Sequence, residues 1–277
     1  MPTLVARAVR ATGVLTLGAS IALSPGCAPA VSLQDEVQLG QEYATQISRE
    51  LPLVEDARVT QYINQLGNSI ANRADSRGIR YSFYVVNAPE VNAFAVPGGH
   101  IYVNRGLIER AANVSELAGV LAHEIGHVVH RHGIEQWQRA QQANTGLAVL
   151  YGVLLGRSPS GIEQAGIQVG GAAVFAGYGR DAEREADASA INYLIATGIH
   201  PQGLVTMFET LLAEHQRNPG AVAQWFSTHP TTQERIDNTQ AAINRLPAGS
   251  LQGLNTNTQA YADFRSRVNR LPASASR

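Results

Sequence analysis

Histidine and glutamate are concentrated in one short apolar segment of the sequence. Four of the eight histidines lie between Leu117 and Gly133, and two of them, His123 and His127, are four residues apart, with Glu124 directly after the first. On a helix, residues four apart are separated by about 6 Å along the axis and project from the same face. Two neutral imidazoles at this spacing can bind one metal ion, with the carboxylate of Glu124 beside it.

This order of residues is the HExxH pattern, and its chemistry is specific. A zinc ion lowers the pKa of water that it binds toward ~7, and a neighbouring carboxylate can accept the proton as the water attacks a polarised carbonyl. His123 and His127 are therefore the predicted ligands of a single zinc ion, and Glu124 is the predicted general base. A catalytic zinc site needs a third protein ligand.

Neither of the histidine positions considered downstream supplies that third ligand. On a continuous helix His130 lies almost two turns beyond His123 and cannot close a tetrahedron with both ligands. Another class of zinc proteases has a histidine ten residues after the first ligand, but Gly133 occupies that position here. The third ligand is therefore expected to be a carboxylate from a second helix.

The segment RDAEREADASA offers three carboxylates for this role. Glu183 and Asp187 are four residues apart and share a helical face, whereas Glu185 points elsewhere. We expect Glu183 to be the third ligand and Asp187 to be an acceptor that orients the ring of a ligand histidine. Taken alone, the segment also fits a solvated helix face on which Arg180 and Arg184 are the ion-pair partners.

The elements that must position these residues are mostly helical. The histidine helix is expected to begin after Ser115 as its N-cap and to end near Gly133 as its C-cap. Strands are expected at 81–87 and within 93–108, the latter as two short strands joined through Pro97, Gly98 and Gly99. Apolar residues recur at helical spacing in further segments, which are 33–51, 57–74, 181–198, 201–216 and 231–246. The predicted fold class is a mostly α-helical α+β domain with a small β-sheet or hairpin beside the histidine helix.

Two segments fit this pattern less well. Residues 144–177 are apolar but broken by glycine and proline, which predicts a packed or mobile hairpin beside the site and not a membrane crossing. Residues 248–277 are predicted to form a polar C-terminal tail with one short helix.

The amino end has the order of a secretory signal. Arg7 and Arg10 precede an apolar run that is too short to span a bilayer. The only cysteine, Cys27, follows this run after a small residue, which resembles the bacterial lipoprotein signal, although Ser24 stands where that pattern usually has leucine. We expect a signal peptide at 1–26, a lipidated Cys27, a tether at 27–33 and a metalloprotease domain at 34–247. A plain signal peptide cleaved nearby is the alternative.

Composition narrows the class of protein further. The chain is 44% hydrophobic and 16% charged, as in ordinary globular domains rather than disordered ones. All 21 basic residues are arginine, the formal net charge is -1, and the arginines form no basic run that could follow a phosphate backbone. Nucleic acid is therefore not an expected partner.

Four motifs together resemble a known family. HEIGH, EREAD, NAFAVPGGHIYVNRGLI and STHPTTQERI occur in the order typical of the zinc metallopeptidase family that includes the HtpX heat-shock protease and the CAAX prenyl proteases. The similarity runs from about Glu36 to Leu246 and is closest to the soluble, periplasmic BepA-like branch, here without TPR repeats. The resemblance implies a gluzincin-type domain with His123, His127 and Glu183 as zinc ligands and Glu124 as the base.

The resemblance also implies roles for residues in the STHPTTQERI motif. His229 precedes Pro230 and a helix, in a loop that the family places over the zinc. It is expected either to occupy the open coordination position and keep the enzyme latent, or to stabilise the oxyanion. Arg235 is expected to bind the substrate carbonyl oxygen or a C-terminal carboxylate. The alternative for Arg235 is an ordinary pair with Glu234 or Asp237.

The NAFAVPGGH segment has two interpretations. Its glycines can simply serve a hairpin turn. Alternatively, Asn92, Ala93, Phe94 and Ala95 form an open strand edge beside the histidine helix, to which an extended substrate backbone adds as one more strand.

These observations predict an exported, zinc-dependent endopeptidase that cleaves misfolded or damaged proteins of the bacterial cell envelope. It is expected on the periplasmic side, as a lipoprotein held in the outer membrane through its N-terminal anchor, with unfolded or misassembled proteins as substrates. The alternative is a zinc-containing chaperone or assembly factor for outer-membrane proteins that rarely cleaves them. The sequence predicts no oligomeric state.

Overall fold

Side-chain caps mark the starts of the first two helices. In the computed structural model, which describes residues 31–143 and 177–272, α1 (Leu33–Glu50) begins after Ser32. The hydroxyl of Ser32 accepts a hydrogen bond from the backbone N–H of Asp35, whose carboxylate accepts from Ser32 in return. Asp56 caps α2 (Ala57–Ala74) by accepting from two backbone N–H groups of its first turn. Both helices were expected from the sequence pattern, and their bounds agree with it.

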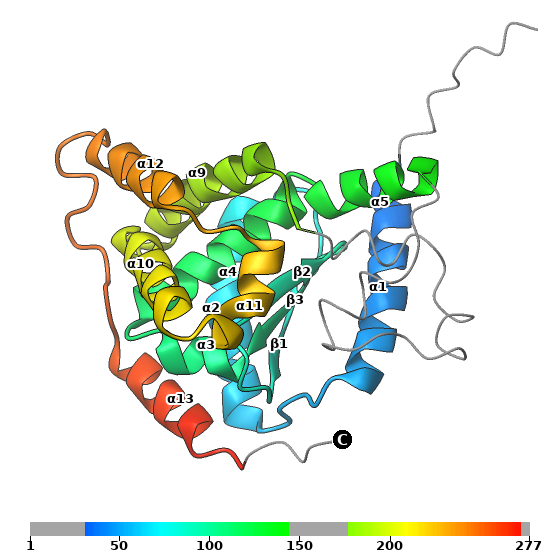
Figure 1. The fold of residues 1–277 in the computed structure, drawn as a ribbon, viewed down its shortest axis with the longest axis horizontal. Helices are drawn as coiled ribbons and strands as arrows, with labels where there is room; N and C mark the ends of the chain where they lie inside the picture. The colour runs from blue at the N-terminus through cyan, green and yellow to red at the C-terminus, as the bar shows by residue number, and fades with distance from the viewer. Residues whose placement is uncertain (1–30, 144–176, 273–277) are drawn as a thin grey trace, which may run out of the picture. The chain divides into compact units, whose positions relative to one another are not determined.

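The remaining described elements follow in chain order (Figure 1). They are β1 (Ser82–Val86), β2 (Ala93–Val96), β3 (His100–Asn104), α3 (Arg105–Arg110), α4 (Val114–Val129), α5 (His132–Ala143), α9 (Arg180–Thr197), α10 (Gln202–Arg217), α11 (Pro219–Thr228), α12 (Gln233–Asn244) and α13 (Gln259–Asn269). The domain is therefore mostly helical with a small sheet, which confirms the predicted fold class. None of the described helices has the length and hydropathy needed to cross a bilayer.

The sheet has the order β1-β3-β2, with β2 at one edge. β3 pairs in parallel with β1 and antiparallel with β2. The expected hairpin between β2 and β3 is present, and Gly98 and Gly99 in its turn have φ angles of 77° and 90°, which a residue with a side chain adopts only with strain. Within the described chain, β3 is the only strand that pairs with β2, so the other edge of β2 has no strand beside it.

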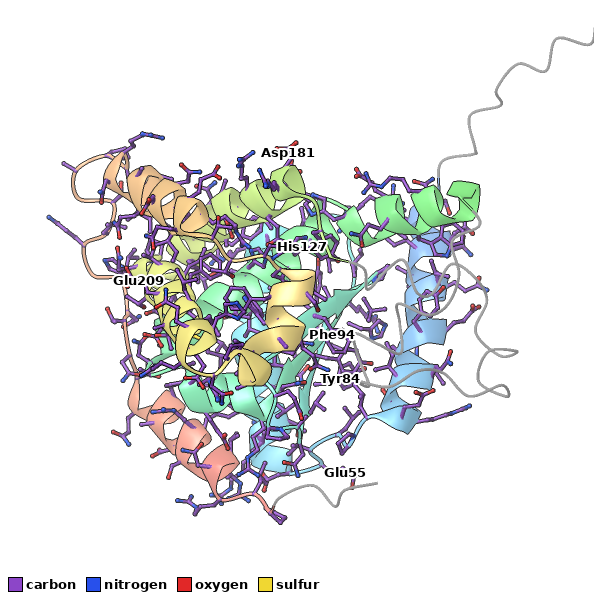
Figure 2. All side chains as sticks on the ribbon, in the orientation of Figure 1. Glu55, Tyr84, Phe94, His127, Asp181 and Glu209 are labelled. Atoms are coloured by element: carbon purple, nitrogen blue, oxygen red, sulfur yellow. The ribbon has the colours of Figure 1, made fainter. Side chains whose placement is uncertain are left out.

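The two faces of the sheet pack against different helices. Phe83, Ile101 and Ala95 belong to the main core that also contains the apolar sides of α2 and α4. Their neighbours along the strands point to the opposite face. There Phe94 and Tyr102 stack with ring centroids 4.9 Å apart and pack with residues of α1. Figure 2 shows Phe94 on this side of the sheet, between the strands and α1.

The central helix is α4, in which every side chain from Val114 to Val128 is buried. It packs against β2, α2, α9 and α10. Gly126 permits a close approach to α9, because a Cβ at this position would lie 3.1 Å from the Cα of Ala186. The backbones of α4 and α9 therefore lie almost in contact at the level of the HExxH motif.

Both predicted ends of the histidine helix were wrong. Its N-cap is Asn113, whose side-chain oxygen accepts from the backbone N–H of Glu116, while Ser115 lies inside the helix and donates to Asn113. Asparagine and serine are similarly good N-caps, and the two residues are only two positions apart. The packing around the helix therefore decides which of them is the N-cap.

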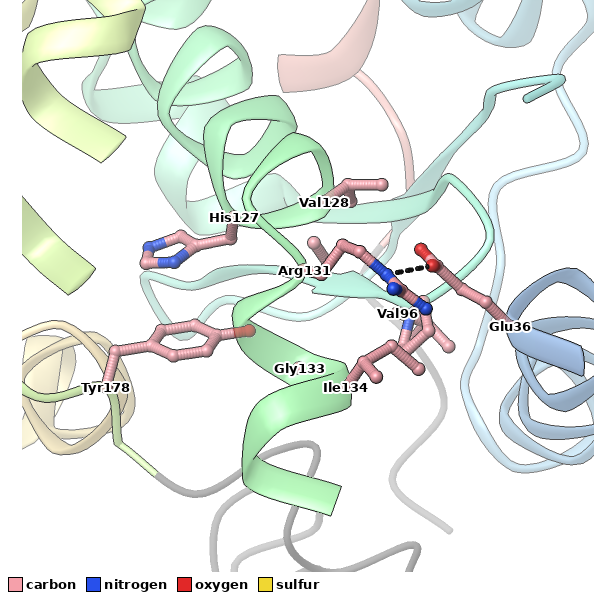
Figure 3. Close-up of a pocket in the computed structure, with 10 residues that line it drawn as sticks. Glu36, Val96, His127, Val128, Arg131, Gly133, Ile134 and Tyr178 are labelled. Carbon is pink, nitrogen blue, oxygen red and sulfur yellow. Dashed lines mark hydrogen bonds and ion pairs between the residues drawn. The ribbon is translucent and has the colours of Figure 1, made fainter. Parts of the chain in front are cut away.

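At the other end, α4 stops at Val129 and not near Gly133. Arg131 has a φ angle of 60° and breaks the helix, after which α5 begins at His132. This left-handed backbone is unfavourable for a residue with a side chain. Arg131 is held by its contact with Glu36 of α1, 2.7 Å from guanidinium Nε to carboxylate oxygen, as Figure 3 shows. Gly133 lies within α5, a position that does not require the conformational freedom of glycine.

The carboxyl-terminal half contains a helix that the sequence pattern did not predict. α11 occupies residues 219–228, so that His229 follows a helix directly as well as preceding α12. Beyond Pro247, α13 packs against α2 and α3 and buries Tyr261, Phe264 and Val268. The expected features at 1–27 and 144–176, including the signal sequence, Cys27 and the apolar hairpin, lie outside the described residues.

The link between α13 and α2 predicts a specific acid response. Arg267 donates to both oxygens of Asp56, and this lowers the pKa of Asp56 to about 2. Because this value lies below the pKa of about 3.9 expected for an unfolded chain, Asp56 stabilises the fold above pH ~4, and the stabilisation disappears as the pH falls toward ~2. Asp56→Asn should therefore lower the melting temperature of the metal-free protein at pH 7, while its amide still caps α2.

The difference in melting temperature between native protein and variant should shrink from pH 4 to pH 2. Asp263→Asn, which removes an exposed carboxylate of α13 that accepts from Gln259, is the control and should differ little from the native protein. A difference that stays constant down to pH 2 would contradict the assigned role of the Asp56–Arg267 pair.

Candidate metal centre

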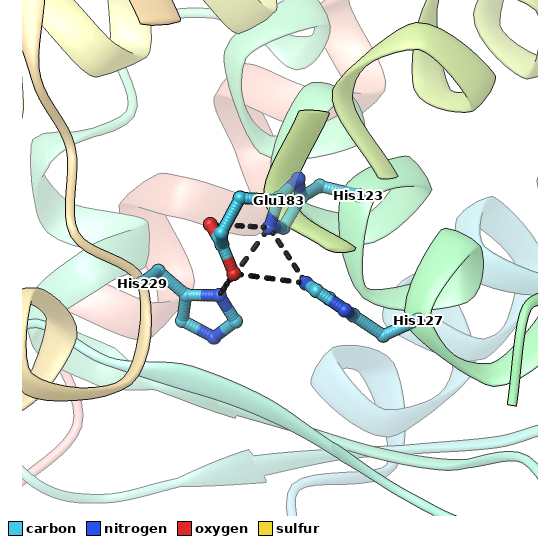
Figure 4. A group of neighbouring side chains, drawn as sticks. All are labelled: His123, His127, Glu183 and His229. Carbon is cyan, nitrogen blue, oxygen red and sulfur yellow. Dashed lines mark hydrogen bonds and ion pairs between the residues drawn. The ribbon is translucent and has the colours of Figure 1, made fainter. Parts of the chain in front are cut away.

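Four buried side chains from three parts of the chain converge on one point. They are His123 and His127 of α4, Glu183 of α9, and His229 in the link between α11 and α12, and one donor atom from each lies within 4.8 Å of the others. Figure 4 shows their donor atoms facing one another. The Nε2 atoms of His123 and His127 are 3.0 Å apart, and Oε1 of Glu183 lies 3.4 Å from Nε2 of His127. The three residues predicted as ligands are thus brought together.

The ionisation states of these groups suit a metal ion. Burial lowers the pKa of His127 well below its usual value, so the imidazole is neutral and its lone pair is available. Burial alone would raise the pKa of Glu183, but the charge of His229 and hydrogen bonds from two histidines hold it well below its usual value. Neutral histidines and an ionised carboxylate are the forms in which these side chains bind a cation. The residues therefore fit a divalent metal.

Glu124 lies beside this group as a separate carboxylate. Both of its oxygens are buried, and neither has a hydrogen-bond partner among the described residues. Burial raises the pKa of Glu124, while the charges of His229 and His123 and the backbone of Ala95 in β2 partly offset that effect. Its Oε1 lies 3.4 Å from Nε2 of His229. Glu124 is therefore a carboxylate whose affinity for a proton is increased, next to the cluster.

Asp187 and Arg235 support the first histidine from behind. Oδ1 of Asp187 lies 2.9 Å from Nδ1 of His123, the ring nitrogen that faces away from the cluster. Arg235 holds both oxygens of Asp187, through Nε and Nη2 at 2.8 Å each, and also contacts Glu183. Burial alone would raise the pKa of Asp187, but its contacts with His123 and Arg235 keep that pKa below its usual value. The carboxylate is thus ionised where it meets the ring.

The alternative considered for Arg235, a pair with Glu234 or Asp237, is not formed. Glu234 binds Arg184 instead, at 2.6 Å, and Asp237 accepts from Gln233. The guanidinium of Arg235 lies over the ring of Phe208, 4.8 Å from its centroid, and is almost fully buried. Its donors are directed to Asp187, Glu183 and the backbone oxygen of Pro230.

His130 and His132, which follow the motif, make contacts that the sequence pattern did not predict. Nδ1 of His132 lies 2.8 Å from Nδ1 of His127, and Nε2 of His132 lies 3.1 Å from a carboxylate oxygen of Glu185. His130 contacts the other oxygen of Glu185 and the hydroxyl of Ser189. On a continuous helix His132 would point away from His127, so only the break at Arg131 brings the two rings together.

Residues beside the cluster complete its walls. Tyr178 stacks on the ring of His127 with centroids 3.8 Å apart and an interplanar angle of 12°. Neither the HExxH nor the EREAD pattern indicated it, since it lies more than fifty residues after His127. Ala93, Phe94 and Ala95 form most of β2, and Asn92 directly precedes it. The side-chain oxygen of Asn92 is buried without a hydrogen-bond partner in the described part of the chain.

A mostly helical domain with an HExxH helix, a carboxylate from a second helix and a small sheet beside them is the architecture of a gluzincin-type metallopeptidase. The model of peptidase family M48 matches residues 57–243 of this chain. The chain belongs to peptidase family M48, and this confirms the resemblance seen in its motifs.

Three relatives illustrate the relationship. The chain is 32% identical over 222 residues to the beta-barrel assembly-enhancing protease of Escherichia coli (strain K12), an alignment that covers 78% of this chain and 45% of that protein. It is 30% identical over 228 residues to the metalloprotease YcaL of the same organism, covering 80% of this chain and 82% of YcaL. It is 32% identical over 181 residues to metalloprotease LoiP, covering 64% and 66%. The chain thus spans less than half the length of the beta-barrel assembly-enhancing proteases that it matches.

The geometry predicts that metal binding depends on Glu183. Glu183→Ala removes the only carboxylate in the cluster that faces both His123 and His127, so the purified protein should retain less than about a tenth of its metal. Elemental analysis of metal per chain measures this. Asp181→Ala, on the same helix but with a side chain that is 98% exposed, is the matched control and should keep full occupancy. Full occupancy in the Glu183 variant would exclude Glu183 as a ligand.

Proposed function

We propose that this protein is a zinc-dependent endopeptidase that hydrolyses peptide bonds of misfolded or damaged cell-envelope proteins. The observation that carries the proposal is the position of Glu124, a buried carboxylate with no hydrogen-bond partner among the described residues, beside the cluster of three histidines and Glu183. Two imidazoles and one carboxylate are the ligands of several catalytic zinc sites, which favours zinc as the metal. When bound, zinc supplies a positive charge that polarises a peptide carbonyl and lowers the pKa of water.

The chain's own residues supply the proton transfers. Glu124 accepts a proton at its carboxylate from the water that attacks the peptide carbonyl, and returns it to the nitrogen of the leaving amine. Its raised pKa suits this role, because a general base is most effective when its pKa is near the working pH. Asp187 keeps the ring of His123 oriented, and Arg235 keeps Asp187 ionised.

The substrate backbone is proposed to lie along β2. This strand is at the sheet edge, and the backbone of Ala95 contributes to the environment of Glu124, so an extended peptide added to β2 would pass the base. Recognition through the main chain depends little on the side chains of the substrate. That suits unfolded or misassembled proteins as substrates.

His229 is proposed to hold the enzyme latent. Nδ1 of His229 lies 3.3 Å from Nε2 of His123 and 3.1 Å from Oε1 of Glu183, close enough to act as a fourth ligand. Catalytic zinc sites keep one coordination position open, whereas four protein ligands close it. The link that carries His229 must therefore move before a substrate carbonyl can enter. The alternative is that His229 donates a hydrogen bond to the developing oxyanion.

The location of the protein is a further part of the proposal. The charged and then apolar order of residues 1–26, followed by Cys27, supports export and a lipid anchor in the outer membrane, on the periplasmic side of a bacterial envelope. The name beta-barrel assembly-enhancing protease, which several relatives carry, supports envelope proteins as substrates. The same name keeps open the alternative of an assembly factor or chaperone that rarely cleaves its clients.

Replacing Glu124 by glutamine distinguishes the two functions. Glu124→Gln keeps the size of the side chain and leaves the metal ligands unchanged, but its amide cannot accept the proton. We expect full metal content and a loss of casein hydrolysis of at least about 100-fold, within the ~10²–10⁴ range of general acid–base catalysis. The exposed Glu209→Gln on α10 is the control. Equal hydrolysis by the native protein and the Glu124 variant would exclude proteolysis at this site.

Replacing His229 distinguishes latency from assistance. His229→Ala leaves three metal ligands in place, so metal content should be retained. If His229 closes the site, the variant should cleave a short fluorogenic peptide at least as fast as the native protein, because the fourth position is open from the start. A large fall in kcat at unchanged metal content would assign His229 to catalysis instead.

A further inference from the structure

The structure assigns to His132 a role that the HExxH and EREAD motifs do not contain: we infer that His132, held by Glu185, fixes the tautomer and ring orientation in which His127 binds the metal. This inference rests on the proposed function, because it takes His127 as a metal ligand. It is carried by the short chain of contacts from His127 through His132 to Glu185.

The direction of each hydrogen bond follows from the chemistry of the three groups. Nε2 of His127 faces the cluster, so it must carry the lone pair, and the proton of the neutral ring is on Nδ1. Nδ1 of His127 therefore donates to Nδ1 of His132, 2.8 Å away. His132 can accept there only if its own proton is on Nε2. That atom lies 3.1 Å from Oε2 of Glu185, and an ionised carboxylate only accepts.

The chain of contacts leaves one consistent arrangement. If His132 carried its proton on Nδ1, then His127 would have to accept it and would present an N–H group to the metal. The carboxylate of Glu185 excludes that arrangement, because it needs a donor at Nε2 of His132. Glu185 thus determines the tautomer of His132, and His132 determines the tautomer of His127. The other histidine ligand, His123, is in direct contact with a carboxylate, that of Asp187.

The fold shows how His132 reaches this position. On an unbroken helix, a residue five positions after His127 would lie about 140° around the axis from it. The left-handed backbone of Arg131 turns the chain between α4 and α5 and brings the ring of His132 back to His127. Arg131 is anchored by Glu36, which is 1% exposed, and by the backbone oxygen of Val31.

Helix α9 supplies the other end of the chain of contacts. Glu183 and Glu185 are two residues apart, so they leave the helix on different sides. Glu183 faces the imidazole cluster, and Glu185 reaches past it to His130 and His132. The side chain of Glu185 is 54% exposed, so water can replace part of its effect, whereas His132 is buried and water cannot replace it as easily.

The test uses substitutions that separate the two nitrogens of His132. The oxygen of an asparagine side chain can occupy the place of Nδ1 of His132. The amide group of the longer glutamine side chain occupies the place of Nε2 and leaves no acceptor at the place of Nδ1. We expect His132→Asn to bind zinc within about threefold of the native dissociation constant, because it still accepts from His127. His132→Gln and His132→Leu lack an acceptor at that point and should bind zinc about 10–100-fold more weakly, the usual effect of losing such a partner.

The dissociation constants are measured by competition with a chromophoric zinc chelator, with no substrate present. His130→Ala is the control, because His130 contacts Glu185 and Ser189 but no ligand of the cluster, and its affinity should be native. The melting temperature of each metal-free variant shows whether it folds. Since His132→Gln and His132→Leu differ in polarity, failure of one to fold leaves the other as the test.

The outcomes separate this inference from the proposed function. Native zinc affinity in His132→Gln or His132→Leu, or an equal loss in His132→Asn, would overturn the role of His132 whatever the hydrolytic activity of the native protein. Weak binding in His132→Gln with near-native binding in His132→Asn supports the role, even if the native protein hydrolyses no peptide. A native protein that binds no zinc would overturn both.

Discussion

The close packing of α4 against α9 is the constraint on which the rest of the centre depends. The HExxH motif supplies two imidazoles from one helix, but a carboxylate can reach them only if the second helix lies almost in backbone contact with the first. Gly126, between the two histidines, permits that contact because a side chain there would press against Ala186. The same contact places Asp187 behind His123. The absence of a side chain at Gly126 therefore allows Glu183 to reach the two histidines and Asp187 to orient the ring of His123.

Charge balance follows from this packing. Glu124, Glu183 and Asp187 are buried together, and burying ionised groups is costly unless opposite charges compensate them. Arg235 compensates part of this charge by contacting both Glu183 and Asp187. Glu124 has no hydrogen-bond partner among the described residues and only His229 as a charged contact, so burial raises its pKa. A divalent cation between the imidazoles and Glu183 would compensate more of the remaining negative charge.

The amino-terminal helix also contributes to the centre from a distance. α1 covers the face of the sheet opposite to α4, and its buried Glu36 binds Arg131 at the junction of α4 and α5. Arg77, in the loop after α2, lies 3.7 Å from Glu36 and donates to the backbone oxygen of Val128, at the end of α4. The end of the HExxH helix is thus held by charged groups from two separate segments. This explains how Arg131 keeps an unfavourable backbone conformation beside the site.

The sequence by itself determined the features that depend on near neighbours along the chain. The spacing of His123 and His127, the helices at 33–51 and 57–74, and the strand at 81–87 depend on residues within one or two turns, and these predictions agree with the structure. The grouping of Glu183 with the two histidines was also expected, because the EREAD motif adds a second helical face with suitable chemistry.

Only the tertiary structure decided the features that depend on long-range packing. The end of α4 at Val129, the partners of Arg235 and the contact of His132 with His127 were not predicted from the sequence. Arg131 adopts its left-handed backbone beside Glu36, which lies 95 residues earlier, and Arg235 meets Asp187, 48 residues earlier. Helical periodicity assumes that a helix continues and that charged groups pair locally. A buried ion pair between distant segments overrides both assumptions, because its partners are defined by the folded core.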